Sequence, residues 1–432
     1  MQILVGFEGD GSGSGELSWG QREMWPAMRR NRSSLGIGGV VPLPEGATVE
    51  DVAAMVRFMI SRHPSLRTRL EFGAGDQPRQ VVSSAGEFPL EIVDTDGDPG
   101  GVAEALWTRY YDVEFDYVNE WPVRMAAVRH GGRPTHLVSL CSHLASDGFG
   151  LAVLKAELST MDRAGPVTGM PPLEQARWQR SPAGRRQSEA ALRYWENALR
   201  TIPARRFPGP TDAHVPPFWE VWFSSPAAHL AALAVAARNA VTTSAVLLAA
   251  FAVAQAKVIG INPVVTQSVV SNRFRPGLAD SVSTVSHPGL CVVDADASFD
   301  EVVARAWRAS LRATKNAYSD PVARQELINR VQAERGERIE LSCYYNDRRV
   351  QRDDQTRPAP TAEQVRAAGR TTLRHVPPVN QTGERFFLHI NNVPATVDIR
   401  LRVDTRHVSP ANAEAVLRGM EAAVTGAATT SR

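Results

Sequence analysis

Hydrophobic and polar positions change their period at one place in the first half of the chain. Residues 136–140 alternate polar and apolar side chains, as a strand with one buried face does. Residues 149–158 then carry apolar side chains at helical spacing. Residues 142–148 therefore form a loop held between a strand and a helix. Such a junction presents a side chain without moving it, and His143 is the best-placed reactive group in it.

The same two periods predict elements along the rest of the chain. Helix starts are indicated by capping pairs and by Pro at the first helical position: Ser18 with Gln21, Thr48 with Asp51, Ser225-Pro226, Ser244, Ser298 with Glu301, Asp320-Pro321 and Ser409-Pro410. Alternation predicts strands at residues 66–72, 123–129, 135–141, 220–223, 264–270, 339–345, 373–376, 386–391 and 397–403, with the segments near 373–376 and 386–391 paired. Gly131-Gly132 has the composition of a hairpin turn between two of them.

The length of 432 residues exceeds what one core usually organises, so two lobes are expected. Residues 163–187 are rich in Pro, Arg and Gly and show neither period, which indicates the boundary between the two lobes. We therefore predict an N-terminal lobe over residues 1–165, a linker over 166–187 and a C-terminal lobe over 188–432.

Composition excludes several classes of protein. A net charge of +2, with 43% hydrophobic and 22% charged residues, is typical of a soluble globular protein rather than a nucleic-acid binder or a disordered chain. The N-terminus lacks the features of a signal peptide, and the longest apolar run, residues 245–254, is about half of what a membrane span needs. We expect a cytoplasmic protein that binds neither nucleic acid nor membrane.

The three cysteines, Cys141, Cys291 and Cys343, lie in apolar strand-like contexts without CxxC spacing. This pattern favours reduced, buried thiols over a zinc site or a disulfide framework.

The loop at residues 142–148 resembles the HHxxxDG motif of the condensation domains of nonribosomal peptide synthetases and of related carrier-dependent acyltransferases. The second histidine, the aspartate and the glycine of that motif fall on His143, Asp147 and Gly148. The first histidine is replaced by Ser142.

Two earlier segments resemble the family's other motifs, in the same order. Ser18, Gln21 and Trp25 match the form S-x-A-Q-x-R-x-W, with the expected arginine displaced to Arg22. Residues 62–68 match R-H-x-x-L-R-T. Taken alone, residues 62–68 also fit a capped helix that runs into a strand, with solvated arginines.

The second half resembles the family more loosely. A strand of condensation domains ends in an arginine that pairs with the motif's aspartate, which makes Arg273 the candidate partner of Asp147. His287-Pro288-Gly289 stands where these domains often have asparagine and threonine, a departure on the side of the acyl donor.

The resemblance implies a standalone, monomeric α/β protein with two chloramphenicol-acetyltransferase-like lobes in a V-shaped pseudo-dimer and an active-site tunnel between them. His143 is then the catalytic residue, as a base or as a hydrogen-bond donor to the tetrahedral intermediate, and Ser142, Asp147, Gly148 and Arg273 structure the site. The acyl donor carries the phosphopantetheine arm of a carrier protein, or CoA, and no cofactor is bound permanently. The acceptor is a small amine or alcohol. The resemblance also implies that the protein acts with partner proteins in the biosynthesis of an antibiotic or a similar natural product.

Other chemistries fit the loop less well. A metal site built on His143 and Asp147 lacks a third ligand at recognisable spacing. Ser142 cannot readily be the nucleophile of His143, because neighbouring side chains of an extended chain point to opposite sides, and there is no G-x-S-x-G elbow. Two functional alternatives remain open: a catalytically inactive docking module for carrier proteins or tailoring enzymes, and an acyl-CoA-dependent O- or N-acyltransferase of the same fold.

Overall fold

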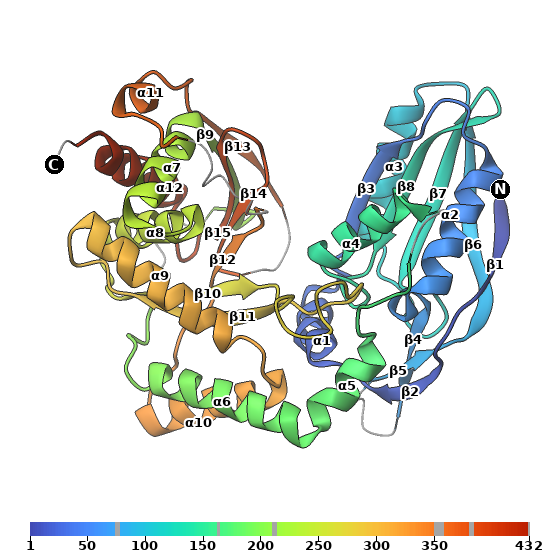
Figure 1. The fold of residues 1–432 in the computed structure, drawn as a ribbon, viewed down its shortest axis with the longest axis horizontal. Coiled ribbons are helices and arrows are strands. Elements are labelled where there is room, and N and C mark those ends of the chain that lie inside the picture. The colour runs from blue at the N-terminus through green and yellow to red at the C-terminus, as the bar shows by residue number, and fades with distance from the viewer. Residues whose placement is uncertain (74–77, 162–164, 210–213, 350–357, 380–383, 431–432) are drawn as a thin grey trace. The chain divides into compact units, whose positions relative to one another are not determined.

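The structure is a computed structural model that describes residues 1–73, 78–161, 165–209, 214–349, 358–379 and 384–430. The chain forms two compact units (Figure 1). The first unit comprises Met1–Gln187 and Ser271–His287, and the second comprises Ser188–Val270 and Pro288–Arg432.

A mixed five-stranded sheet forms the centre of the first unit. Its order is β1 (Gln2–Glu8), β6 (Ala85–Thr95), β7 (Val123–His130), β8 (Arg133–Cys141) and β3 (Ile37–Pro42), with only the β6–β7 pair parallel. Met125 and Ala127 of β7 pack into one hydrophobic cluster with α2 (Val49–Arg62) and α4 (Gly148–Leu158), while Ala126 and Val128 pack into another with α3 (Pro99–Asp112). The central strand is therefore buried on both faces, which explains its continuous apolar sequence.

The remaining elements of the first unit lie beside this sheet. They are a three-stranded sheet of β2 (Gly13–Glu16), β5 (Pro78–Val82) and β4 (Thr68–Phe72), the short 3-10 helix η1 (Pro64–Arg67), α1 (Trp19–Asn31) and α5 (Pro172–Arg180). The predicted β7–β8 hairpin is confirmed, and Gly131 and Gly132 adopt the positive φ angles of 57° and 77° that its tight turn requires.

A seven-stranded sheet forms the centre of the second unit. Its order is β11 (His287–Val293), β10 (Val264–Val270), β12 (Cys343–Asp347), β14 (Phe386–Asn391), β15 (Val397–Asp404), β9 (Phe218–Ser225) and β13 (Thr372–Val379). The helices α7 (Pro226–Asn239), α8 (Thr243–Ile259), α9 (Phe299–Lys315), α11 (Ala362–Arg366) and α12 (Pro410–Thr429) share the hydrophobic cluster on one face (Figure 1). On the other face, α6 (Pro182–Leu199) and α10 (Pro321–Arg335) pack against Val265 of β10 and Leu290 of β11.

The observed units differ from the predicted lobes in two places. Residues 166–187, predicted as a linker, contain α5 and the start of α6 and belong to the first unit. Residues 271–287, predicted within the C-terminal lobe, also belong to the first unit. Two strand predictions were wrong. The strands β13 and β14 do not pair, since β13 pairs with β9 and β14 lies between β12 and β15, and β12 begins only at Cys343.

All three cysteines are buried and free, as predicted. Burial raises the pKa of Cys141 and Cys291 to about 12 and that of Cys343 to about 11. Over the described part of the chain, no single helix has both the length and the apolarity to cross a membrane, and only α7 and α8 taken together, bent by 109°, meet those criteria.

Candidate functional site

The loop between β8 and α4 lies where the change of period placed it, since β8 ends at Cys141 and α4 begins at Gly148. From Cys141 to Asp147, every residue is buried except His143. Gly148, the next residue, is exposed. The loop thus presents one imidazole and one glycine to the outside and keeps its other side chains within the unit.

Distant residues of the first unit fix the backbone of His143. Its N–H donates to the carbonyl oxygen of Ser34 at 3.1 Å, and its carbonyl oxygen accepts from the hydroxyl of Thr284. Gly20 of α1 lets Thr284 approach closely, because a Cβ on Gly20 would lie 1.7 Å from the carbonyl oxygen of Thr284. Both polar backbone groups of His143 are therefore satisfied within the unit.

Ser142 points into the unit, in agreement with the alternation of side chains expected there. Its side chain is fully buried, and its Oγ lies 2.9 Å from the hydroxyl of Tyr117 and accepts from the N–H of Leu144 at 3.2 Å. Burial raises the pKa of Tyr117 to about 12, so this phenol stays protonated. Tyr117 also packs edge-on against Trp25, with ring centroids 5.7 Å apart, and so connects the first motif to the third.

Asp147 is the N-cap of α4, and its Oδ1 accepts from the N–H of Gly150 at 2.9 Å. The ion pair predicted with Arg273 is present: Nη1 lies 3.0 Å from Oδ2, and Nη2 lies 2.9 Å from Oδ1. Oδ2 also accepts from the N–H of Val285 and from the N–H and hydroxyl of Ser286, at 2.8–3.1 Å. The carboxylate therefore joins α4 to the segment 271–287.

Electrostatics keep Asp147 ionised in spite of its burial. Burial alone raises the pKa of this carboxyl, but the charge of Arg273 and the hydrogen bonds from Arg273, Gly150 and Ser286 more than offset it, so the pKa lies below its ordinary value. Arg273 also donates to the carbonyl oxygens of Ser281 and Ser283, at 2.9 and 3.3 Å. Asp147 thus acts as an anchor whose oxygens are all occupied, rather than as an acid or base.

The two glycines at the start of α4 differ in their surroundings. A Cβ on Gly148 would have no atom within 4 Å. A Cβ on Gly150 would lie 2.3 Å from Oγ of Ser146 and 3.2 Å from Nη2 of Arg273. Packing therefore requires glycine at position 150 and leaves open space at position 148.

The second motif braces the far end of α4. Arg62 and His63 contact the carboxylate of Glu157, with Nε of Arg62 at 3.2 Å and Nε2 of His63 at 2.7 Å. Burial lowers the pKa of His63, and this effect outweighs the opposing attraction of the Glu157 carboxylate. Arg67 is fully buried and donates to the carbonyl oxygens of Gly11, at 2.7 Å, and of Asp10 and Ser83. The alternative in which the arginines of residues 62–68 are solvated is therefore wrong for Arg67.

The first motif begins α1 as predicted. Ser18 and Gln21 form a reciprocal capping box, and the displaced Arg22 pairs with Glu16. His287 is fully buried, with its Nδ1 3.7 Å from the carboxylate of Glu23. The described residues hold no group of three or more His, Cys, Asp or Glu side chains arranged to bind a metal.

The structure brings all five predicted site residues together in the first unit. Four of them lie at the loop between β8 and α4, namely Ser142, His143, Asp147 and Gly148, and the ion pair with Asp147 joins Arg273 to that loop. Sequence reasoning missed Ser34, Tyr117 and Thr284, which hold the loop from outside. They are single polar residues in loops or irregular segments, and no spacing relates them to the motif.

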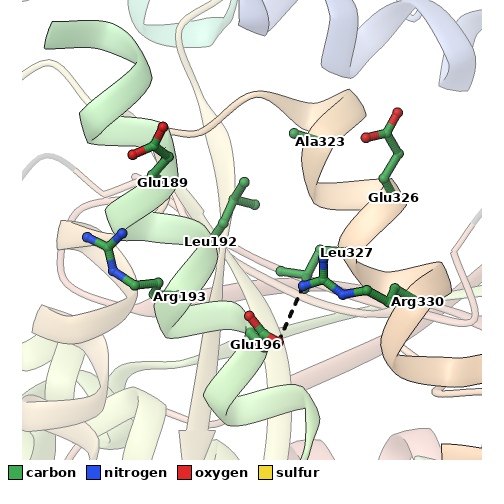
Figure 2. A pocket seen from close by; sticks show the side chains of 8 residues that line it. All are labelled: Glu189, Leu192, Arg193, Glu196, Ala323, Glu326, Leu327 and Arg330. Atoms are coloured by element: carbon green, nitrogen blue, oxygen red, sulfur yellow. Dashed lines mark ion pairs between the residues drawn. The ribbon is translucent and has the colours of Figure 1, made fainter. Parts of the chain in front are cut away.

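A separate groove of about 520 Å³ lies between α6 and α10 in the second unit (Figure 2). Leu192, Ala323 and Leu327 contribute its apolar part, and charged side chains surround them, with Arg330 paired to Glu196. None of the predicted site residues lines this groove.

Comparison with known proteins agrees with this geometry. The family model for the condensation domain matches residues 17–342. The chain is 28% identical over 327 residues to isonitrile lipopeptide synthase of Mycobacterium tuberculosis (strain ATCC 25618 / H37Rv), covering 69% of this chain and 13% of that protein. It is 27% identical over 284 residues to the AMB antimetabolite synthetase AmbB of Pseudomonas aeruginosa, covering 61% of this chain and 22% of that protein. The chain thus spans only a small part of these relatives.

Solved structures share the fold. The condensation domain of the monacolin K polyketide synthase MokA has a TM-score of 0.75 at 12% identity, covering 98% of this chain and 99% of that one. The condensation domain that mediates chain release from the enacyloxin polyketide synthase has a TM-score of 0.73 at 19% identity, covering 96% and 83%. The X-domain from teicoplanin biosynthesis, in its complex with OxyB, has a TM-score of 0.71 at 18% identity, covering 96% and 93%. With the family match over residues 17–342, the chain belongs to the condensation domain family.

Proposed function

We propose that this domain transfers an acyl or aminoacyl group from a carrier-bound thioester to an amine or hydroxyl acceptor, with His143 as its catalytic residue. The observation that supports the proposal most directly is the exposure pattern of the motif. From Cys141 to Asp147 only His143 is not buried, while its backbone is fixed at both polar groups. A rigid backbone with one reachable proton acceptor is what a general base or a stabiliser of a tetrahedral intermediate needs.

The reaction needs little activation, because a thioester is already reactive. The acceptor's lone pair forms the new C–N or C–O bond, the C–S bond breaks, and the acceptor's proton reaches the leaving thiolate. Holding the two reactants in register can supply about 7–11 kcal/mol of the barrier. A positioned imidazole that takes and returns the proton adds about 10²–10⁴-fold. In this proposal the thiol of the phosphopantetheine arm is the leaving group, and a carrier protein is the partner.

Asp147 and Arg273 contribute by position alone. The oxygens of Asp147 and the two terminal nitrogens of Arg273 bond to each other, to the N–H of Gly150 and to residues 281–286. The two side chains therefore hold the loop and do not touch a reactant. Ser142 likewise supports the loop from within, through Tyr117 and Leu144. The loss of the first motif histidine therefore leaves the reacting position intact.

A catalytically inactive docking module is the second candidate. Ser142 in place of the first motif histidine favours it, and so does the fold shared with the X-domain, which is known in complex with OxyB. In that case the domain recruits a carrier protein or a tailoring enzyme and transfers nothing.

Intact-mass analysis separates the two candidates. Carrier proteins loaded with acyl or aminoacyl groups, and acyl-CoA in a parallel arm, are incubated with a panel of amines and alcohols, with and without the domain. Loss of acyl mass from the donor, together with a new amide or ester that requires the domain, supports transfer. A carrier that binds the domain in a pull-down but keeps its acyl group under every condition overturns transfer and supports docking. Turnover of acyl-CoA alone overturns the carrier as donor.

A further inference from the structure

The seven-stranded sheet of the second unit has two chemically different faces. On strands β9, β14 and β15 alternate residues, such as Phe223, Leu388 and Leu401, are buried in the cluster with α7, α8 and α12. The residues between them carry aromatic and charged side chains instead. Within the second unit, the apolar contacts of the helices α6 and α10 on this second face include Val265 of β10 and Leu290 of β11.

The strand register places these side chains in neighbouring rows. His389 of β14 is paired with Arg400 of β15, and Phe387 is paired with Arg402. On the next strand, Arg400 is paired with Trp222 and Arg402 with Glu220. Because directly paired residues on adjacent strands project to the same face, the side chains of this set are neighbours.

Aromatic rings flank the arginines on both sides. Tyr344 and Phe387 have ring centroids 5.2 Å apart, and the rings of Phe387 and His389 are 4.0 Å apart. On the other side, the guanidinium of Arg374 lies 4.5 Å from the ring centroid of Trp222. The face therefore offers flat apolar surfaces next to cationic groups.

Positive charge is in excess on this face. Glu220 is shared by two arginines, with its Oε2 2.7 Å from Nη2 of Arg400 and 3.4 Å from Nη2 of Arg402. Arg348, which follows β12, contacts Nε2 of His389 at 3.4 Å, and Arg374 is the fourth arginine. Two further carboxylates on this face of β15 already have partners: Asp398 accepts from the amide of Asn391 at 2.7 Å, and Asp404 pairs with Arg406 at 2.7 Å.

The arginines of β15 disfavour a positive charge on Arg348 and on His389. Partial burial, and then repulsion from Arg400 and Arg402, lower the pKa of Arg348 to about 10, although the residue keeps exposed surface. Burial, followed by the charges of Arg348, Arg400 and Arg402, holds the pKa of His389 well below its ordinary value. His389 is therefore neutral near pH 7 and can donate a hydrogen bond without adding to the positive charge.

We propose that Arg348, Arg400, Arg402 and His389 form a binding site for an oxyanion, a carboxylate or a phosphate, carried by one of the two reactants. Arginine presents a planar fork of donors that matches such groups, and an anion here would relieve the repulsion among the three guanidiniums. Phe387 and Tyr344 would contact the apolar part of the ligand next to the anion. The statement that the ligand is a reactant rests on the proposed function. The existence of an anion-binding site does not depend on that function.

Binding of small probes by the whole chain tests the site and its source. Calorimetric titrations compare two matched pairs that differ only in the anion: 4′-phosphopantetheine against pantetheine, and 4-aminobenzoate against 4-aminobenzamide. We expect the anionic member of one pair to bind at least about tenfold more tightly than its neutral twin. Arg348→Gln and, separately, Arg402→Gln should remove that preference. Arg418→Gln, an exposed arginine on α12 paired with Glu414, is the control and should keep it.

Each outcome decides something. Preference for 4′-phosphopantetheine that the two variants remove assigns the site to the donor arm, and preference for 4-aminobenzoate that they remove assigns it to a carboxylate-bearing acceptor. The inference is overturned if neither pair shows a preference for the anion. It is also overturned if the preference survives in both variants while their urea midpoints match that of the parent. The titrations need no acyl donor. A protein that binds the anion but never transfers an acyl group therefore keeps this inference and overturns only the transfer.

Discussion

His143 is half-buried, whereas every other residue from Cys141 to Asp147 is buried, so its imidazole contributes less to packing than its neighbours do. We therefore expect His143→Ala to lower transfer by about 10²-fold or more, which corresponds to about 3 kcal/mol of transition-state stabilisation, without a change in the urea midpoint. Initial rates on a carrier-bound donor, measured beside a urea melt, check both parts. Turnover equal to the parent's would show that His143 is not catalytic.

Ser142 occupies a closed site beside Tyr117, where a larger side chain has to displace its neighbours. Overpacking such a site costs typically about 1–3 kcal/mol, so we expect Ser142→His to lower the free energy of unfolding by that amount. Transfer should stay within about tenfold of the parent, because position 142 faces the interior. If the parent is inactive and Ser142→His gains transfer, the serine is an inactivating change and the native role is binding.

Gly148 and Gly150 form a matched pair on the first turn of α4. Gly148→Ala adds a methyl group to open space, so stability should hold or rise slightly, since alanine is the better helix former. Transfer should nevertheless fall if a reactant passes this point. Gly150→Ala should destabilise the protein, because its Cβ collides with Ser146. Full activity in a stable Gly148→Ala variant would mean that no reactant uses the space above residue 148.

At the scale of elements, Asp147 joins the N-terminus of α4 to the segment 271–287 through Arg273. Removing either partner leaves a buried charge uncompensated, so Asp147→Ala and Arg273→Ala should each cost about 3–5 kcal/mol of stability. The double variant should lose less than the sum of the two. Urea melts of the four proteins complete this cycle, and strict additivity would show that the two side chains do not interact.

The same ion pair predicts the direction of a pH effect. The pKa of Asp147 in the folded protein lies below its unfolded value, so its contribution to stability is complete above the unfolded pKa and is lost as the pH falls through the folded pKa. In Asp147→Asn this part of the acid dependence should be absent. Urea midpoints measured from neutral to acidic pH compare the two proteins.

Signals between residues close in sequence predicted most helix starts, whereas contacts between residues distant in sequence were mostly not predicted. The capping boxes at Ser18 and Thr48 and the N-cap at Asp320 are confirmed, because a cap bonds to residues two or three positions away. Ser298 is the N-cap of α9 as predicted, but its side chain makes no capping hydrogen bond, so the predicted capping pair with Glu301 was wrong. The helix predicted from Ser244 is capped by Thr242 instead, a shift typical of element ends. The helix α5 was missed because its buried face includes Gln175 and Gln179, which interrupt the apolar period.

Pairing and charge burial depend on the whole fold. The strands β13 and β14 are consecutive in the chain, yet two other strands separate them in the sheet, and no local pattern encodes that order. Arg67 looks like a surface residue in sequence, but three backbone carbonyls from other segments accept hydrogen bonds from its two terminal nitrogens inside the unit. The motif residues were found because the family resemblance supplied their roles, whereas Ser34 and Thr284 had no such signal.

At the scale of the whole molecule, the first unit is completed by a segment from the second half of the chain. Residues 271–287 supply Arg273, the carbonyl oxygens that hold it, and the backbone donors to Asp147. Ser65 donates to the carbonyl oxygen of Val282 in the same segment, at 2.5 Å. The candidate site is therefore a product of long-range topology, even though its motif is only seven residues long.

A chain truncated to residues 1–187 tests this dependence. It retains the whole motif and the five-stranded sheet but loses every partner of the Asp147 carboxylate except Gly150, as well as the hydroxyl of Thr284 that binds the carbonyl oxygen of His143. We expect the fragment to lack a cooperative urea transition, since a buried, unpaired carboxylate costs several kcal/mol, a large part of a typical domain's stability. Circular dichroism and urea melts of the fragment and of the full chain measure this. The same fragment with Asp147→Asn carries no buried charge, so it should be less destabilised than the wild-type fragment. A wild-type fragment that unfolds cooperatively at the midpoint of the full chain would show that the first unit does not need residues 271–287, and the anchoring role assigned to Asp147 would then be wrong.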